Sequence, residues 1–129
     1  MTAALYRTLR KICGLTQHEA ADFHQVKLRT IQHWESGRSN PPPGAMAELE
    51  RLNAKIERAV AGNVQLYHNL NDGELPKTVD LYCYRTAEGY AASRAGKEGL
   101  PWGANSELIG RTLLALRSHG VEVNVEYFD

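Results

Sequence analysis

The sequence predicts an α+β fold that is mostly α, with an N-terminal helical bundle followed by a small α/β module. Apolar residues recur at helical spacing through the first half of the 129-residue chain. Alternation of apolar and polar residues is confined to two short segments, 78–84 and 121–128, which we expect to be strands. The hydrophobic fraction of 43% is ordinary for a folded domain and excludes wholesale disorder.

The first helix is predicted from Leu5, Leu9 and Ile12, which recur at helical spacing, and Gly14 ends it. The opposite side of this helix is expected to carry three basic side chains: Arg7, Arg10 and Lys11. The apolar residues would then face the core of the bundle.

The second helix begins with a capping signal. Thr16 is a good N-cap, and Glu19, three residues later, completes a capping box. The helix is expected to run to about His24 and to bury its alanines. Either Phe23 or His24 points inward beside them, and the sequence leaves that choice open.

A third short helix is expected from about Lys27 to Gly37, with Leu28, Ile31 and Trp34 turned inward. Its outer side would carry a polar set: Lys27, Arg29, Thr30, Gln32 and His33. Long polar side chains near the start of a helix suit base reading in the DNA major groove, where Gln pairs with adenine and Arg with guanine. We therefore predict base contacts by Arg29, Gln32 and His33, and contacts shared between bases and phosphates by Lys27 and Thr30.

Phosphate contacts are predicted for three residues beside this helix: Gln17, Arg38 and Asn40. Gln17 lies in the first turn of the second helix, where the helix terminus adds a partial positive charge. Glu35 is expected to orient a basic neighbour such as Arg38. The alternative is an ordinary solvated helix face, which the capping box and the Trp-Glu-Ser-Gly-Arg ending make less favourable.

Residues 1–70 are expected to form this head together with a long amphipathic helix that starts at about residue 44, after a proline-rich spacer. Residues 71–129 are expected to form a strand, two helices and a second strand. Thr86 would cap the first of these helices, a Gly-rich loop through Gly96, Gly99 and Gly103 would follow, and Ser106 would cap the second.

Charge is distributed unevenly, although the net charge is zero. Residues 1–62 hold nine Lys and Arg against six Asp and Glu, and residues 63–129 hold six against nine. This asymmetry is the one expected if only the first half approaches phosphates.

Several functional classes are disfavoured by the composition. The two cysteines match no metal spacing, no catalytic set or phosphate loop is present, and no cofactor or metal is expected. No apolar run approaches the length needed to span a bilayer, and the first residues lack a signal-peptide pattern. A cytoplasmic protein without catalytic residues is the expectation.

The head resembles the Xre/lambda-repressor-like helix-turn-helix family over roughly residues 5–52. The resemblance is carried by Leu9-Arg10, Gly14-Leu15-Thr16-Gln17-His18-Glu19-Ala20-Ala21, Thr30-Ile31 and Trp34-Glu35-Ser36-Gly37-Arg38-Ser39-Asn40-Pro41. One departure lies before the turn, where this family commonly has leucine and then glycine and this chain has His24 and Gln25.

More narrowly, the chain resembles the anti-CRISPR-associated repressors and their YdiL-like relatives. The motifs are Glu19-Ala20-Ala21, Gln32-His33-Trp34-Glu35-Ser36-Gly37-Arg38-Ser39 and Asp72-Gly73-Glu74-Leu75-Pro76-Lys77. This resemblance implies a lambda-repressor-like head, a C-terminal dimerisation module and a homodimer that represses its own operon from an inverted repeat in double-stranded DNA. It also leaves RNA open as a second ligand.

A homodimer is also expected from the residues themselves. Two short strands make too small a sheet to be stable alone, and pairing with a twin would satisfy its edges. The residues predicted to serve dimerisation are Val121, Val123, Val125 and Tyr127. An antitoxin-like or RNA-binding regulator with the same head is the alternative function, and a sensor with a small effector stays open.

Overall fold

The computed structural model describes residues 2–128, apart from the side chain of Glu98. The chain forms two compact units, Met1–Lys55 and Ile56–Asp129. The division lies within the long helix α4, Pro43–Leu70. The structure is mostly helical with one two-stranded sheet, which confirms the predicted fold class. No helix among the described residues is long and apolar enough to cross a membrane.

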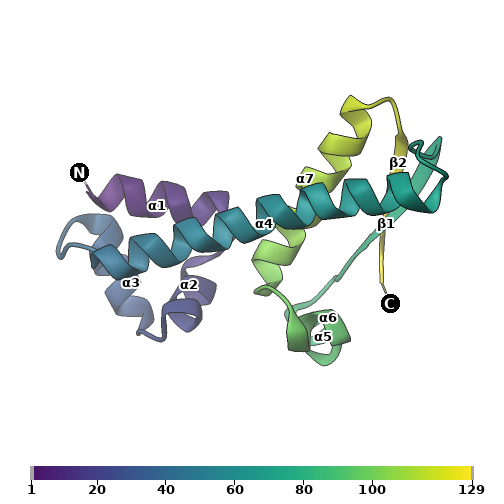
Figure 1. Cartoon of the computed structure of the whole chain (residues 1–129). Coiled ribbons are helices and arrows are strands. Elements are labelled where there is room, and N and C mark those ends of the chain that lie inside the picture. Colours follow the sequence, from purple (N-terminus) through teal and green to yellow (C-terminus); the bar gives the residue numbers. More distant parts are fainter. Residues whose placement is uncertain (1, 129) are drawn as a thin grey trace. The chain divides into compact units, whose positions relative to one another are not determined.

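The first unit contains α1, Thr2–Ile12, α2, Gln17–His24, α3, Leu28–Ser36, and the beginning of α4 (Figure 1). The capping box of α2 forms as predicted, since Thr16 Oγ1 accepts from the Glu19 N–H and the Glu19 carboxylate accepts from the Thr16 N–H. Helix α4 starts at Pro43, a position where the missing proline N–H costs nothing.

The buried face of α1 differs from the predicted one. Tyr6 and Arg10 are buried in the helix and Cys13 is buried just after it, whereas Leu5 and Ile12 are 51% and 41% exposed. The prediction from apolar spacing was wrong because it placed Arg10 among the exposed polar side chains. The arginine is instead a core residue with its own buried partner.

Helix α2 ends in a left-handed residue, Gln25, with φ 58° and ψ 46°. Its N–H bonds back to the carbonyls of Ala21 and Asp22, and the Val26 N–H reaches the Ala21 carbonyl at 2.9 Å. A residue other than glycine in this conformation carries steric strain at Cβ. The turn between α2 and α3 therefore keeps its geometry despite a residue that disfavours it.

The second unit contains β1, Thr78–Cys83, α5, Ala87–Ala92, α6, Arg94–Glu98, α7, Trp102–Ser118, and β2, Glu122–Tyr127. Thr86 caps α5 as predicted. The Gly-rich loop was predicted wrongly: Gly96 lies in α6, and α7 begins at Trp102, before Ser106. Gly96 is needed for packing, because a Cβ there would collide with the Tyr90 carbonyl.

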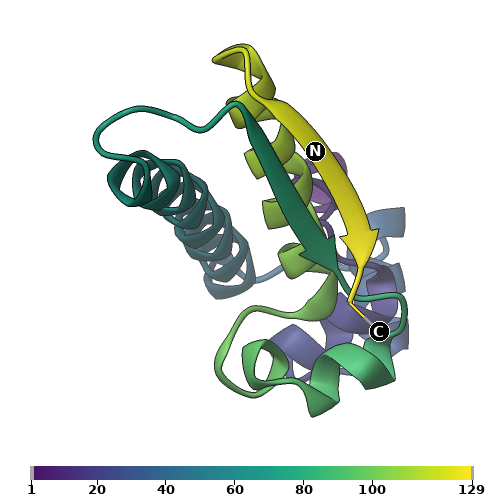
Figure 2. The same ribbon diagram turned by 90° about the vertical axis from the view of Figure 1, so that its right-hand side faces the viewer.

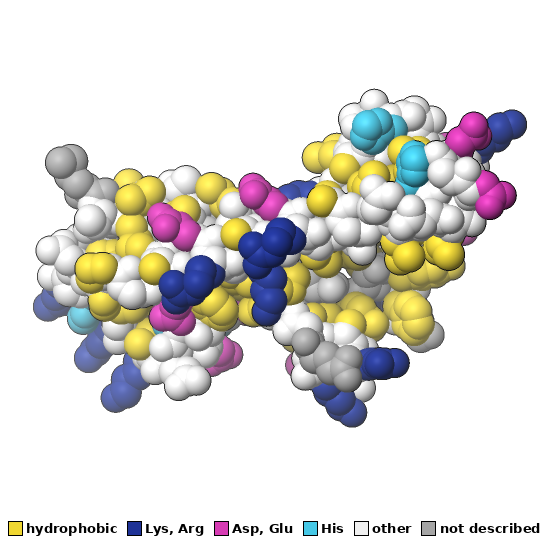
Figure 3. Space-filling model, in the orientation of Figure 1, with side chains coloured by type: hydrophobic (Ala, Val, Ile, Leu, Met, Phe, Trp, Pro, Cys, Tyr) yellow, Lys and Arg dark blue, Asp and Glu magenta, His cyan; other side chains and the backbone are white. Residues whose placement is uncertain are grey.

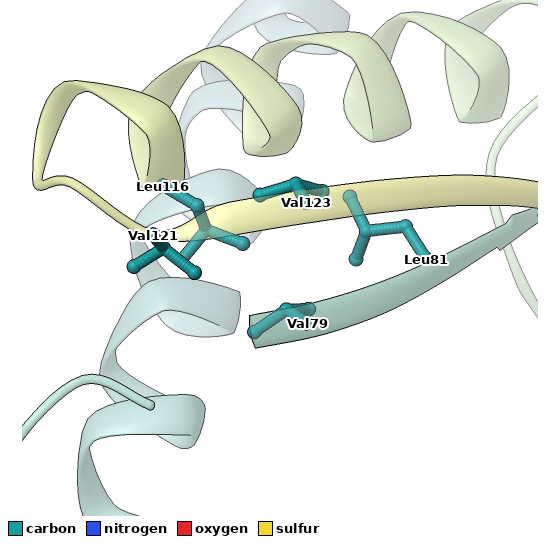
Figure 4. Packing of buried hydrophobic residues seen from close by; sticks show 5 residues of the cluster. All are labelled: Val79, Leu81, Leu116, Val121 and Val123. Atoms are coloured by element: carbon teal, nitrogen blue, oxygen red, sulfur yellow. The ribbon is translucent and has the colours of Figure 1, made fainter. Parts of the chain in front are cut away.

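The two strands run parallel, with Val79 opposite Val123 and Leu81 opposite Val125 (Figure 2). One face of this sheet packs against α7, and its core brings five side chains together (Figure 4). These are Val79, Leu81, Leu116, Val121 and Val123. Of the four residues predicted to serve dimerisation, Val121 and Val123 are covered within the chain, whereas Val125 and Tyr127 are 38% and 52% exposed.

His24, rather than Phe23, supplies the buried ring at the end of α2. Its side chain is only 2% exposed, and its ring centroid lies 5.8 Å from those of Tyr6 and Trp34. Both ring nitrogens are buried without a well-formed hydrogen bond, and Nδ1 lies 3.5 Å from the Glu48 carboxylate. Burial lowers the pKa of His24 below its usual 6.5, and the Glu48 carboxylate opposes that shift only in part.

We expect the Gln25→Gly variant to increase the free energy of unfolding of the first unit by about 0.5–1 kcal/mol, because glycine removes the Cβ strain. Gln25→Ala keeps a Cβ and should bring no gain. Urea unfolding of the full chain followed by Trp34 fluorescence, in a Trp102→Phe background, measures both. Equal stabilisation by alanine and glycine would contradict the strain at this position.

The free energy of unfolding should fall as the pH drops below about 6.5. The unfolded chain protonates His24 at its ordinary pKa, whereas the folded chain resists the proton, so acid favours unfolding. His24→Leu removes this proton-binding difference. Urea unfolding at pH 7.5 and pH 5.5 should therefore show a larger loss for the natural chain than for the variant. Identical losses would show that His24 does not titrate in this way.

Candidate nucleic-acid interface

Helix α3 has one buried side and one polar side. Ile31 is fully buried and Trp34 is 6% exposed, which fixes the inner face of the helix. Arg29 and Gln32 are exposed on the opposite side, one helical turn apart. The helix therefore presents a polar face that its own core does not cover.

The other predicted residues of α3 lie around this face. Lys27 is exposed as the N-cap residue, and its side chain makes no capping hydrogen bond. Thr30 and His33 are half-buried. Figure 3 shows Lys and Arg side chains, with a His beside them, gathered over the α3 region of the first unit. The structure thus places four of the five predicted residues within one short helix and the fifth, Lys27, at its N-cap.

A buried ion pair joins α1 to the end of α3. Arg10 Nε donates to Glu35 Oε2 at 2.6 Å and its Nη2 donates to Oε1 at 2.9 Å, while Nη1 donates to the Leu15 carbonyl at 2.8 Å. The side chains of Arg10 and Glu35 are 8% and 6% exposed. Such a bidentate pair fixes distance and orientation together.

This finding corrects the predicted partner of Glu35, which is Arg10 rather than Arg38. Burial by itself would raise the pKa of the Glu35 carboxyl, but hydrogen bonds from Arg10 and Gln17 and the nearby positive charges outweigh it. The pKa of Glu35 therefore lies below its ordinary value, and the carboxylate stays ionised at neutral pH.

Gln17 belongs to the same network. Its Nε2 donates to Glu35 Oε1 at 3.2 Å, so the side chain is held in the first turn of α2. The amide keeps a second N–H, which could donate a hydrogen bond to a phosphate oxygen. Glu35 therefore links a side chain at the start of α2 to the helix that carries the polar face.

Arg38 and Asn40 lie exposed beyond α3, after Gly37 ends the helix in the left-handed conformation. Asn40 Oδ1 accepts a hydrogen bond from Thr2 at 3.4 Å. In the part of the chain that the structure describes, the side chains that bond to or pair with Glu35 are those of Arg7, Arg10 and Gln17, and neither Arg38 nor Asn40 joins them.

Two further candidates were missed from the sequence. Arg7 is 58% exposed and lies 4.0 Å from Glu35, which places its charge near Gln17. Ser36 is exposed on the side of α3 that carries Gln32, and its hydroxyl donates to the His33 carbonyl at 3.2 Å. The helical position of Ser36 could have identified it, whereas Arg7 depends on the buried pair and could not be found without the fold.

Breaking the buried pair should destabilise the first unit by about 3–5 kcal/mol, because either single change leaves an uncompensated buried charge. We expect this for Arg10→Met and for Glu35→Leu. The double variant Arg10→Met/Glu35→Leu removes both charges and should be more stable than either single variant. Urea unfolding with Trp34 fluorescence provides the comparison, and additive losses in the double variant would contradict the pairing.

Comparison with known proteins agrees with these features. The family model described as Aca2/YdiL-like matches residues 1–118. The chain is also similar to the Aca2 repressor of Pectobacterium phage ZF40, with 33% identity over 104 residues, which covers 79% of this chain and 84% of that protein. The match to the family model runs from α1 to the end of α7 and stops before β2. The chain belongs to the Aca2/YdiL-like family, whose named relative is a repressor.

Proposed function

We propose that this protein is a sequence-specific DNA-binding transcriptional repressor of the cytoplasm, which binds an inverted repeat as a homodimer and represses its own operon. The single observation that carries the proposal is the polar face of α3, opposite Ile31 and Trp34. A helix of this kind fits the major groove with its first residues against base edges. The similarity to a repressor supports the regulatory role.

The roles of the residues follow from their positions. Arg29, Gln32 and His33 project from the outer side of α3 and are assigned to base edges. Lys27 and Thr30 are assigned to bases or phosphates.

Phosphate contacts are assigned to residues that lie outside the outer face of α3. Gln17 lies at the start of α2, and Arg38 and Asn40 lie beyond the end of α3. The exposed Arg7 adds a positive charge near Gln17, because both side chains lie against the Glu35 carboxylate. Contacts on both sides of the reading helix would fix its register on the duplex.

Dimerisation is assigned to the second unit, with DNA reading in the first. One small head reads few base pairs, whereas two heads about 34 Å apart read two half-sites one helical turn apart. Purification of the chain in a stable complex with a different protein, without operator binding, would instead favour an antitoxin-like function.

Arg29→Ala and Gln32→Ala should each weaken binding to the natural operator by about 1–3 kcal/mol and relax base choice at one position. Gln17→Ala and Arg38→Ala should weaken binding to all sequences more evenly and reduce its salt dependence. The operator is first obtained by selection from random DNA, and fluorescence anisotropy against single-base operator variants then separates the two classes. Equal behaviour of both pairs of variants would overturn this division of roles.

A further inference from the structure

The sheet of the second unit ends at β2. It has two strands among residues 2–128, and Figure 2 shows no further strand beyond β2. The N–H of Glu122 bonds to the Lys77 carbonyl at 2.9 Å, and that of Phe128 bonds to the Cys83 carbonyl at 2.8 Å. Since backbone groups alternate along a strand, residues 122, 124, 126 and 128 face β1, and residues 123, 125 and 127 direct their N–H and C=O groups to the open edge.

The open edge is apolar at its C-terminal end. Val125 and Tyr127 lie on the sheet face that carries the core, yet they are 38% and 52% exposed. The neighbouring Phe128 is 60% exposed. An unpaired edge with exposed apolar residues is a template for another strand, and a two-stranded sheet gains stability when it is extended.

We propose that β2 pairs antiparallel with β2 of a second copy of this chain, with Val125 opposite the same residue of that copy. A two-fold axis pairs identical strands in antiparallel orientation, so the two sheets would join into one of four strands. The inference deepens the homodimer of the proposed function and depends on it.

Backbone direction restricts the register. Only residues 123, 125 and 127 offer hydrogen-bonding groups to the edge, so a symmetric ladder must oppose these residues to one another. The two-fold axis then passes through the position of one residue rather than between two residues. The candidate axis positions are therefore the six residues of β2, 122 to 127.

Repulsion between glutamates excludes three of these six axis positions. An axis at residue 122 or 126 opposes a glutamate to itself, and an axis at residue 124 opposes Glu122 to Glu126. Like charges directly opposite each other destabilise a strand pair. An axis at residue 123 would leave Tyr127 opposite residue 119, outside the strand, and an axis at residue 127 would leave Val123 without a partner.

The axis at Val125 meets every condition. It opposes Val123 to Tyr127 and extends the apolar row across the seam between the two copies. It also opposes Asn124 to Glu126, and the same amide and carboxylate already bond within the strand at 3.0 Å. Both exposed apolar side chains of the inner face would be covered.

Cysteine pairing tests the register. Opposed residues in such a ladder have Cα atoms about 5.5 Å apart, which suits a disulfide, whereas residue 124 would lie about 8 Å from its counterpart, too far for one. Val125→Cys should form a covalent dimer in an oxidised glutathione buffer, and Asn124→Cys should not. The natural chain, which holds Cys13 and Cys83, serves as the control on a non-reducing gel.

A charge placed in the seam tests the surface independently. Val125→Arg opposes two guanidinium groups and should raise the dimer dissociation constant at least tenfold in sedimentation, with an unchanged circular dichroism spectrum. Leu114→Arg is the matched control, because Leu114 is 65% exposed and lies on α7, outside the strands.

A covalent dimer of Asn124→Cys instead of Val125→Cys would overturn the register. A natural chain that is dimeric, while Val125→Arg is equally dimeric and Val125→Cys stays unlinked, would overturn this surface alone and leave the proposed function intact. A monomeric natural chain would overturn the dimer itself. Operator binding by the natural chain, measured beside Arg29→Ala, reports separately whether the head reads DNA.

Discussion

The ion pair between Arg10 and Glu35 is the interaction on which the first unit depends. Two charges are withdrawn from water, and such a pair is tolerated only when its geometry is good and its remaining donors are satisfied. Both conditions hold here, since the guanidinium binds both carboxylate oxygens and also the Leu15 carbonyl. The pair therefore acts as a fixed link between α1 and the last turn of α3, and it adds a directional constraint to the apolar packing of Ile31 and Trp34.

That constraint connects the core to the candidate interface. Glu35 also accepts a hydrogen bond from Gln17 of α2, so one carboxylate contacts side chains of two other helices, α1 and α2. An error in the orientation of α3 would strain these contacts at once, because hydrogen bonds weaken steeply with angle. The outer face of α3 therefore has a rigid support, as the proposed reading of bases through a few contacts would require.

The sequence predicted the elements of the first unit well because local signals define them. The capping box at Thr16, the glycine after α3 and the proline at the start of α4 each act within a few residues. The same reasoning misplaced Arg10, because a buried charge is recognisable only when its partner, distant in sequence, is known. The prediction of a Gly-rich loop was wrong for a related reason. Gly96 is required because the Tyr90 carbonyl packs closely against it, and no local pattern reveals that contact.

The second unit shows how a strand can belong to the core and to an open edge at the same time. Alternation along β2 predicted correctly that one face is apolar, but it could not show that Val121 and Val123 are covered by α7 while Val125 is not. The outer face of the same sheet is acidic at Asp80 and Glu122, both exposed. This face disfavours a polyanion. In the proposed function, the phosphate contacts therefore belong to the first unit, and the open edge of β2, with its exposed Val125 and Tyr127, is assigned to contact with a second copy of this chain.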